Sequence, residues 1–242
     1  MEKIKKLKKI FKREKIDGYI VPKNDEFFGE YVPDYNDRLN FISNFSGSYG
    51  LALILKNENY LFVDGRYTLQ ANNQSKKFFK VITIPSQMPS DILRKKKLLL
   101  GFDPNLFTKK SLSIYFGKSK SVYKPLAKNF IDEIWKRKIK KNKNKFFVLP
   151  TGSVSETYQS KIGKITSYLK RKKSDFLFIT ASENNAWLLN IRGGDSEFTP
   201  IPHSHILISK KGDIKFFCDL KKLTPSLKKK LKKVEFIEIK SI

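Results

Sequence analysis

The 242-residue sequence contains one cysteine and two histidines. The single thiol, Cys218, excludes an internal disulfide and any cysteine cluster that would bind a metal ion. The sequence also lacks a run of about 18 apolar residues, the length that a membrane-spanning helix needs. Its first 18 residues are rich in lysine but contain no apolar stretch of the kind found in secretory signals. These absences predict a cytoplasmic protein with no membrane partner.

Acidic residues are also scarce, with 23 Asp and Glu against 50 Lys and Arg, so the formal net charge is +27. A charge of this size at first favours a nucleic-acid partner. However, only seven of the basic residues are Arg, whose planar fork is preferred for specific contacts to bases. Most lysines fall on expected helix faces and in linkers. A solvated basic surface is therefore the preferred interpretation, and no nucleic-acid partner is expected.

What the sequence does contain is a short pattern that occurs twice, as NFISNFSG at residues 40–47 and as AWLLNIRG at 186–193. In both copies an aromatic residue is followed by Asn three positions later and by Gly six positions later. Each copy precedes a predicted β-hairpin that ends in aspartate, at Asp64 and Asp219. The pattern therefore indicates one structural unit used twice.

The order of predicted elements around the pattern repeats as well. A helix, a strand, the pattern, a hairpin, a helix and a strand follow one another from residue 4 to 85 and again from 155 to 239. Such alternation predicts an α/β fold in which helices cover a sheet. Ser155 is expected to cap the first helix of the second unit, and Trp187 is expected to lie in the core.

The second unit is shorter than the first. The first continues beyond residue 85 with alternating helices and strands, whereas only three residues follow the last strand of the second. The second unit is therefore expected to be truncated, with an unpaired sheet edge and an uncovered apolar face. A basic linker between the units places domain I at residues 1–140 and an incomplete domain II at 141–242.

Four stretches of the sequence resemble a known enzyme family. DGYIVPKNDEFFGEYVPDYNDRLNFISNFSGSYGLALIL, followed by LFVDGRYTLQA, is similar to the first domain of the long, three-domain Xaa-Pro aminopeptidases (aminopeptidase P). FIDEIWKRK and AWLLNIRGGDSEFTPIPHSHILI resemble the linker and second domain of the same enzymes. The resemblance implies two creatinase N-terminal-like α/β units with mixed sheets, the second truncated.

The resemblance also implies a third, C-terminal catalytic domain, in which Asp, His and Glu side chains hold two metal ions, usually manganese. This sequence contains none of that domain's metal-ligand motifs. We therefore expect a chain that binds no metal or other cofactor and is inactive by itself, with two manganese ions in the missing catalytic domain.

The function implied is that of the non-catalytic N-terminal part of an enzyme that removes the residue before proline, contributing to subunit assembly and substrate access. The expected partners are the catalytic domain or chain, a second copy in a homodimer, and proline-containing peptides as substrates of the intact enzyme. The alternative is a free-standing interaction or dimerisation module with the same fold.

Three polar residues are candidates for facing the substrate: Asp37, Arg38 and Arg66. In the resembled enzymes the first domain packs toward a catalytic site, often that of a neighbouring subunit. A guanidinium group could hold a peptide carboxylate or carbonyl there. Alternatively, Arg66 and Asp64 fix a strand-to-helix corner through local hydrogen bonds.

Two other residue types could carry chemistry. His203 and His205 are two apart on a predicted strand, so both rings could reach one ion, but no carboxylate stands at a short fixed spacing as a third ligand. Ordinary surface or edge histidines are the preferred interpretation. Cys218 lies in an apolar strand, where a buried, unreactive thiol is expected.

Overall fold

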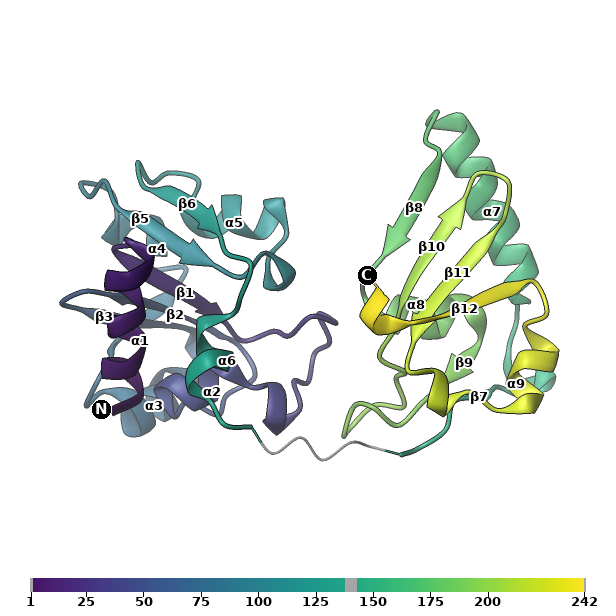
Figure 1. Ribbon diagram of the computed structural model, residues 1–242, viewed down its shortest axis with the longest axis horizontal. Coiled ribbons are helices and arrows are strands. Elements are labelled where there is room, and N and C mark those ends of the chain that lie inside the picture. The colour runs from purple at the N-terminus through teal and green to yellow at the C-terminus, as the bar shows by residue number, and fades with distance from the viewer. Residues whose placement is uncertain (1, 138–142, 242) are drawn as a thin grey trace. The chain divides into compact units, whose positions relative to one another are not determined.

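The computed structural model describes residues 2–137 and 143–241, which form two compact units (Figure 1). Unit 1 comprises Met1–Asp25 and Asp34–Ile139, and unit 2 comprises Glu26–Pro33 and Lys140–Ile242. The predicted boundary at residues 140 and 141 lies outside the described residues. The structure adds one feature that the sequence did not indicate, since Glu26–Pro33 interrupts unit 1 in the sequence but belongs to unit 2.

Unit 1 is built on a six-stranded mixed sheet with the strand order β4-β3-β2-β1-β5-β6. Neighbouring strands are antiparallel from β1 to β3 and parallel elsewhere. The strands are β1 (Gly18–Pro22), β2 (Gly50–Leu55), β3 (Asn59–Asp64), β4 (Lys80–Ile84), β5 (Leu99–Phe102) and β6 (Val122–Pro125). The helices are α1 (Glu2–Glu14), α2 (Arg38–Ser43), α3 (Thr68–Ser75), α4 (Pro89–Ile92), α5 (Lys109–Phe116) and α6 (Phe130–Ile134), with short 3-10 turns at η1 (Asp34–Asn36), η2 (Gly65–Tyr67) and η3 (Pro104–Leu106).

Helices cover both faces of this sheet. On one face α1 buries Ile4, Leu7 and Phe11, whose spacing places them on one side of the helix, against a core that includes α2, α3 and α6. On the other face, side chains of the sheet pack with Phe116 of α5 and with Leu93, directly after α4. Unit 1 therefore has three layers, as an α/β fold requires.

Unit 2 contains a four-stranded mixed sheet, ordered β12-β11-β10-β8, and a two-stranded ribbon of β7 and β9. β8, β10 and β11 are antiparallel, and β12 is parallel to β11, which repeats the arrangement of β1 to β4. The strands are β7 (Phe147–Val148), β8 (Phe176–Ile179), β9 (Ile191–Arg192), β10 (His205–Ser209), β11 (Ile214–Cys218) and β12 (Val234–Glu238). The helices are α7 (Tyr158–Arg171), α8 (Ser182–Leu189) and α9 (Pro225–Lys230), with 3-10 turns at η4 (Thr151–Ser153), η5 (Leu220–Lys222) and η6 (Ile239–Ser241). The prediction of α/β units with mixed sheets is confirmed.

The repeated sequence pattern marks the end of a helix in both units. Asn44 caps the C-terminus of α2 and Asn190 caps that of α8, and both asparagines adopt the left-handed conformation, with φ of 63° and 55°. Asparagine tolerates this conformation better than most residues do, so it ends a helix in the way that glycine commonly does. The glycine three positions later lies against an aromatic ring, and a Cβ atom on Gly193 would be 2.7 Å from the ring of Phe146.

The two predicted hairpins also end in the same way, with an aspartate that starts a 3-10 turn. The side chain of Asp64 accepts a hydrogen bond from the amide of Arg66 at 2.9 Å, and that of Asp219 accepts one from the amide of Lys221 at 3.0 Å. Each aspartate thereby opens a 3-10 turn, because a short side-chain acceptor can bond the backbone two residues ahead. The two aspartates have the same structural role.

Two predictions about unit 2 are wrong. Thr157, rather than Ser155, caps α7, because its hydroxyl reaches the amide of Ser160, which lies in the first turn of the helix. Trp187 is not a core residue, since 59% of its surface is exposed, whereas Leu188 and Leu189 are buried. In α8 these leucines face the core and the indole lies on the outer side.

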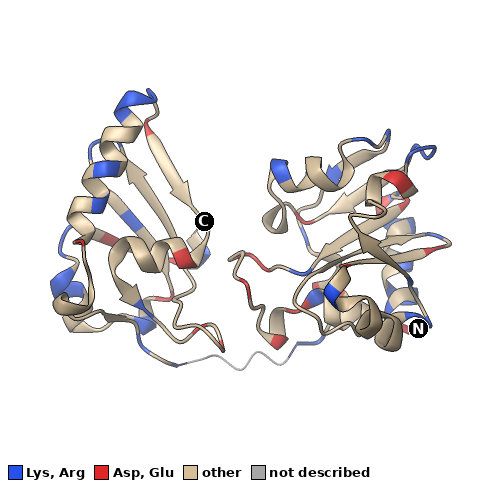
Figure 2. Ribbon diagram, turned by 180° about the vertical axis from the view of Figure 1, so that it is seen from behind, with Lys and Arg blue, Asp and Glu red and all other residues tan. Residues whose placement is uncertain are grey.

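The basic residues do not gather on one element. Figure 2 shows Lys and Arg distributed over helices and turns of both units. None of the described helices has the length and apolar character needed to cross a membrane.

Candidate functional site

Arg38 lies at the start of α2 and is buried, with 2% of its side chain exposed. Its Nε and Nη2 atoms donate to the two carboxylate oxygens of Asp132 in α6, each at 2.9 Å. Such a two-point contact matches the planar guanidinium to the planar carboxylate and fixes both groups. The Arg38 guanidinium is therefore committed to an internal ion pair.

Asp132 also binds a second cation. Arg137 Nη2 lies 2.6 Å from Asp132 Oδ2, and Arg137 Nη1 donates to Asn36 Oδ1 at 2.7 Å and to the carbonyl of Tyr35 at 3.3 Å. The Asp132 carboxylate thus connects α6 to α2 through Arg38, 94 residues away in the sequence, and to the η1 turn through Arg137. These contacts fix the η1 turn, which directly precedes α2, to α6.

Asp37 caps α2. Its Oδ1 accepts a hydrogen bond from the amide of Asn40 at 3.0 Å, and its Oδ2 lies 2.5 Å from Lys23 Nζ. Burial raises the pKa of the Asp37 carboxyl, while the Lys23 ammonium group and the Asn40 amide oppose this effect. Asp37 therefore starts the helix, as aspartate commonly does at this position.

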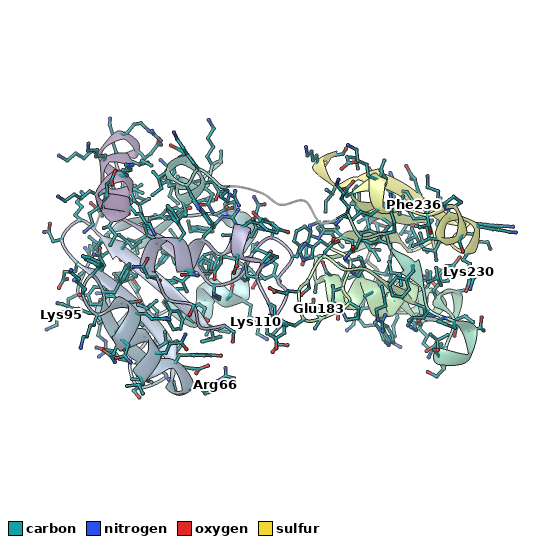
Figure 3. All side chains as sticks on the ribbon, turned by 90° about the horizontal axis from the view of Figure 1, so that it is seen from below. Arg66, Lys95, Lys110, Glu183, Lys230 and Phe236 are labelled. Atoms are coloured by element: carbon teal, nitrogen blue, oxygen red, sulfur yellow. The ribbon has the colours of Figure 1, made fainter. Side chains whose placement is uncertain are left out.

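Arg66 differs from the other two candidates because 72% of its side chain is exposed. Its Nη2 donates to Asp64 Oδ2 at 2.6 Å, which agrees with the local hydrogen bonding considered from the sequence. Figure 3 shows Arg66 at the outer surface of unit 1. Of the three predicted residues, only Arg66 presents a largely solvent-exposed guanidinium group, and the structure does not bring it together with Asp37 and Arg38. A substrate-facing role stays a prediction for all three.

Two lysines that the sequence did not single out bind the repeated helix ends. In unit 2, Lys161 Nζ donates to the carbonyl of Trp187 at 2.6 Å and to Asn190 Oδ1 at 2.7 Å, and it lies 4.1 Å from the centre of the indole ring. Burial lowers the pKa of Lys161. A cation at a helix C-terminus satisfies carbonyl groups that have no partner within the helix.

Unit 1 repeats this arrangement with Lys3. Its Nζ donates to the carbonyl of Phe41 at 2.8 Å, lies 3.5 Å from Asn44 Oδ1, and lies 4.6 Å from the centre of the Phe41 ring. The repeated pattern therefore has a fourth member, a lysine near the start of the unit's first helix. The spacing could have revealed it, because Lys3 precedes Asp17 by 14 residues, as Lys161 precedes Asp175.

The two histidines pack against an aromatic ring of the segment Glu26–Pro33. Phe27 stacks on His203 with 4.1 Å between ring centres and on His205 with 5.4 Å. The His205 Nδ1 atom lies 3.2 Å from the carbonyl of Thr180, and burial lowers the pKa of the ring. Within residues 2–137 and 143–241, no three His, Cys, Asp or Glu side chains come together in a way that suits a metal ion.

A cavity of about 560 Å³ in unit 2 lies beside the loop between β9 and β10. Asp195 anchors this loop, because its carboxylate accepts a hydrogen bond from the amide of His203 at 2.8 Å and pairs with Lys222. The cavity lining is mixed in character: Asn144, Lys145, Phe147, Gly193, Gly194, Ser196, Glu197, Phe198, Thr199 and Pro200. This composition does not favour one ligand class.

The predicted burial of Cys218 is confirmed. Removal from water raises the pKa of its thiol to about 12. At neutral pH the group therefore remains a thiol rather than the nucleophilic thiolate.

Two family models match the chain, both described as the creatinase/prolidase N-terminal domain, one over residues 3–120 and the other over residues 137–242. Among curated proteins, the chain is 31% identical to the Xaa-Pro aminopeptidase app-1 of Caenorhabditis elegans over 92% of its own length, and 30% identical to a probable Xaa-Pro aminopeptidase P of Laccaria bicolor over 86%. The chain spans 39% and 34% of the lengths of these relatives.

Among solved structures, the X-prolyl aminopeptidase of C. elegans, described as a cytosolic enzyme with a di-nuclear active site, aligns with 99% of the chain. The TM-score is 0.91 at 27% sequence identity, and the alignment covers 42% of that enzyme.

Proposed function

The chain belongs to the creatinase/prolidase N-terminal domain family, and on this basis we propose that it is the non-catalytic N-terminal part of a metal-dependent Xaa-Pro aminopeptidase. The observation that carries the proposal is the agreement over nearly the whole chain with relatives that are Xaa-Pro aminopeptidases. In the proposed enzyme the two manganese ions and the hydrolytic step belong to a catalytic region beyond the part of the relatives that this chain matches. The chain contributes to subunit assembly, as part of a cytoplasmic homodimer, and to substrate access.

The chain alone is expected to release no N-terminal residue from an Xaa-Pro peptide, with or without added manganese. A chimera that joins this chain to the remaining part of the C. elegans enzyme is expected to release that residue. The measurement is the rate of amino-acid release from the same peptide by both proteins. Metal-dependent cleavage by the chain alone, or a folded chimera without activity, would contradict the proposal.

Within this function we propose that Arg66 faces the substrate, because its guanidinium group is largely exposed, whereas Arg38 is buried against Asp132. Replacement of Arg66 by Ala in the chimera is expected to raise the KM about tenfold, as loss of one charged contact does, with little change in kcat. Arg94, also exposed, provides the matched control, and Arg94→Ala should leave the KM unchanged. Equal KM values for the two variants would exclude a substrate contact by Arg66.

The exposed apolar side chains of β8 favour the second candidate function, an interaction module. Phe176 and Phe178 both lie on one side of this strand and are exposed. An apolar surface of this kind commonly binds another polypeptide.

A further inference from the structure

A second pocket of unit 2, with a volume of about 430 Å³, lies between the C-terminal end of α7 and the turn that joins β10 to β11. Figure 1 shows this turn beside α7, and a Cβ atom on Gly212 in the turn would be 3.7 Å from Thr166 of the helix. Four lysines and one serine line the pocket: Lys170, Lys173, Ser174, Lys210 and Lys211. The lining therefore contains four positive charges and no carboxylate.

The end of α7 presents three of these residues. Lys170 lies in the last turn of the helix, and Lys173 follows the helix in the left-handed conformation, with φ of 52°. The amide of Lys173 donates to the carbonyl of Lys170 at 3.1 Å, and the amide of Ser174 donates to that of Leu169 at 3.0 Å. Backbone amides thus satisfy carbonyl groups at the helix end, as is common where a helix stops in this way. The lysine side chains are not needed as donors to these carbonyls.

The turn between β10 and β11 presents the other two lysines. The amide of Lys210 donates to the carbonyl of Asp175 at 2.8 Å, and its ammonium group pairs with the Asp175 carboxylate at 2.7 Å. Lys211 follows, and Gly212 then adopts a φ of 95°, which glycine accepts without strain. Because Lys210 is fixed to the start of β8, both lysines stay beside the end of α7.

The equivalent hairpin of unit 1 is shorter. There the backbone bond that closes the turn joins the amide of Leu55 to the carbonyl of Glu58, whereas in unit 2 it joins the amide of Ser209 to the carbonyl of Asp213. The turn of unit 2 therefore has one more residue, and it places lysines at 210 and 211 where unit 1 has Lys and Asn. The second lysine of the turn is a feature of unit 2.

Three of the four charges are not neutralised by the protein. Within the described parts of the chain, Lys170, Lys173 and Lys211 form no ion pair, and all three are exposed. Asp213, the acidic residue nearest to Lys211 in the sequence, instead accepts a hydrogen bond from the Ser209 hydroxyl at 2.7 Å. Like charges that share one pocket repel one another, so a bound anion would lower the energy of this arrangement.

The chemistry of the lining favours phosphate groups. A lysine ammonium group binds phosphate as a point charge, and the Ser174 hydroxyl can donate to a phosphate oxygen. One phosphate group carries about two negative charges near neutral pH, so three unpaired lysines match two linked phosphate groups better than one. The volume also lies within the range of about 300 to 1,000 Å³ that is usual for small-molecule sites.

We propose that the pocket between α7 and the β10–β11 turn, named here the lysine pocket, binds a small molecule that contains a diphosphate group. Lys170 and Lys173 contact the group from the helix end, Lys211 contacts it from the turn, and Ser174 donates a hydrogen bond. The ligand thereby bridges two segments that lie about 40 residues apart in the sequence, and it stabilises unit 2 by binding its folded form. This binding does not depend on whether the protein is part of a peptidase.

The test is calorimetric titration of the full chain with inorganic pyrophosphate at an ionic strength of about 0.15 M, which screens the general charge of the protein. We expect pyrophosphate to bind at least about tenfold more tightly than orthophosphate, because it engages more of the lysines. Titration with ADP separates two sources of the diphosphate group. Tighter binding of ADP than of pyrophosphate would assign the site to a nucleotide, and equal or weaker binding of ADP would assign it to inorganic diphosphate.

Lys170→Gln and Lys211→Gln should each weaken the binding of pyrophosphate about tenfold, as loss of one charged contact does. Lys12→Gln is the matched control, since Lys12 follows Lys3 by nine residues, as Lys170 follows Lys161, and is also exposed. It should leave the affinity unchanged. Circular dichroism checks that each variant is folded.

Three results would each overturn the proposal. The first is a failure of pyrophosphate to bind, and the second is equal affinity for pyrophosphate and orthophosphate. The third is a loss of affinity in Lys12→Gln as large as that in Lys211→Gln, which would mean that the net charge of the protein, rather than the lysine pocket, attracts the anion.

Discussion

Replacement of Asp132 by Ala is expected to destabilise unit 1 by about 3 kcal/mol. The variant leaves the guanidinium group of Arg38 buried without its two carboxylate bonds, and Arg137 loses its contact at 2.6 Å. Removing one partner of a buried pair costs more than the pair contributes, because the remaining charge stays in a poorly solvated place. Partial exposure of Asp132 keeps the expected loss at the lower end of the usual range.

The measurement is urea unfolding followed by the fluorescence of Trp135, in a background in which Trp187 is replaced by Phe. Glu58 provides a matched control, because its carboxylate also bridges two cations, Lys80 and Lys96, whose side chains are 67% and 37% exposed. Glu58→Ala should cost less than about 1 kcal/mol. If Asp132→Ala is no more destabilising than Glu58→Ala, the cluster around Asp132 does not hold unit 1 together.

Replacement of Lys161 by Met is expected to destabilise unit 2 by about 2 kcal/mol. Methionine retains the apolar stem of lysine but donates no hydrogen bonds, so the Trp187 carbonyl and Asn190 Oδ1 lose their contacts at 2.6 and 2.7 Å. The favourable charge at the C-terminus of α8 is lost as well. Because Lys161 is buried, water replaces the missing donors poorly.

Hydrogen exchange of the β10 and β11 amides measures this loss within unit 2. Lys164 is the matched control, since it lies one turn further along α7 and its side chain is 72% exposed. Lys164→Met should change stability by less than about 0.5 kcal/mol. Lys3→Met should have an intermediate effect in unit 1, because its second contact is longer, at 3.5 Å. Similar losses for Lys161 and Lys164 would mean that the buried ammonium group does not stabilise the end of α8.

The sequence predicted those features that depend on neighbouring residues. Asp64 and Asp219 act on amides two positions ahead, so their turns could be identified directly from the hairpin patterns. The Asn of the repeated pattern likewise has a local role, because it caps the C-terminus of the helix that directly precedes it. Local rules suffice for such elements.

Features that join distant segments could not be found in this way. Arg38 and Asp132 are 94 residues apart, and the sequence around either residue does not indicate that the two form an ion pair. The sequence therefore places Arg38 among the substrate-facing candidates and gives no sign that its side chain is buried. Trp187 was expected in the core because its neighbours are apolar, but only the packing of α8 determines which side of the helix faces inward.

The placement of Glu26–Pro33 in unit 2 affects how such proteins can recombine. A crossover in the linker would bring unit 1 of one parent together with most of unit 2 of another, yet these eight residues would still come from the first parent. Phe27 of one sequence would then have to stack on the residues at positions 203 and 205 of the other. The part of unit 2 that must be inherited together is therefore discontinuous in the gene, and a single exchange at the linker cannot transfer it whole.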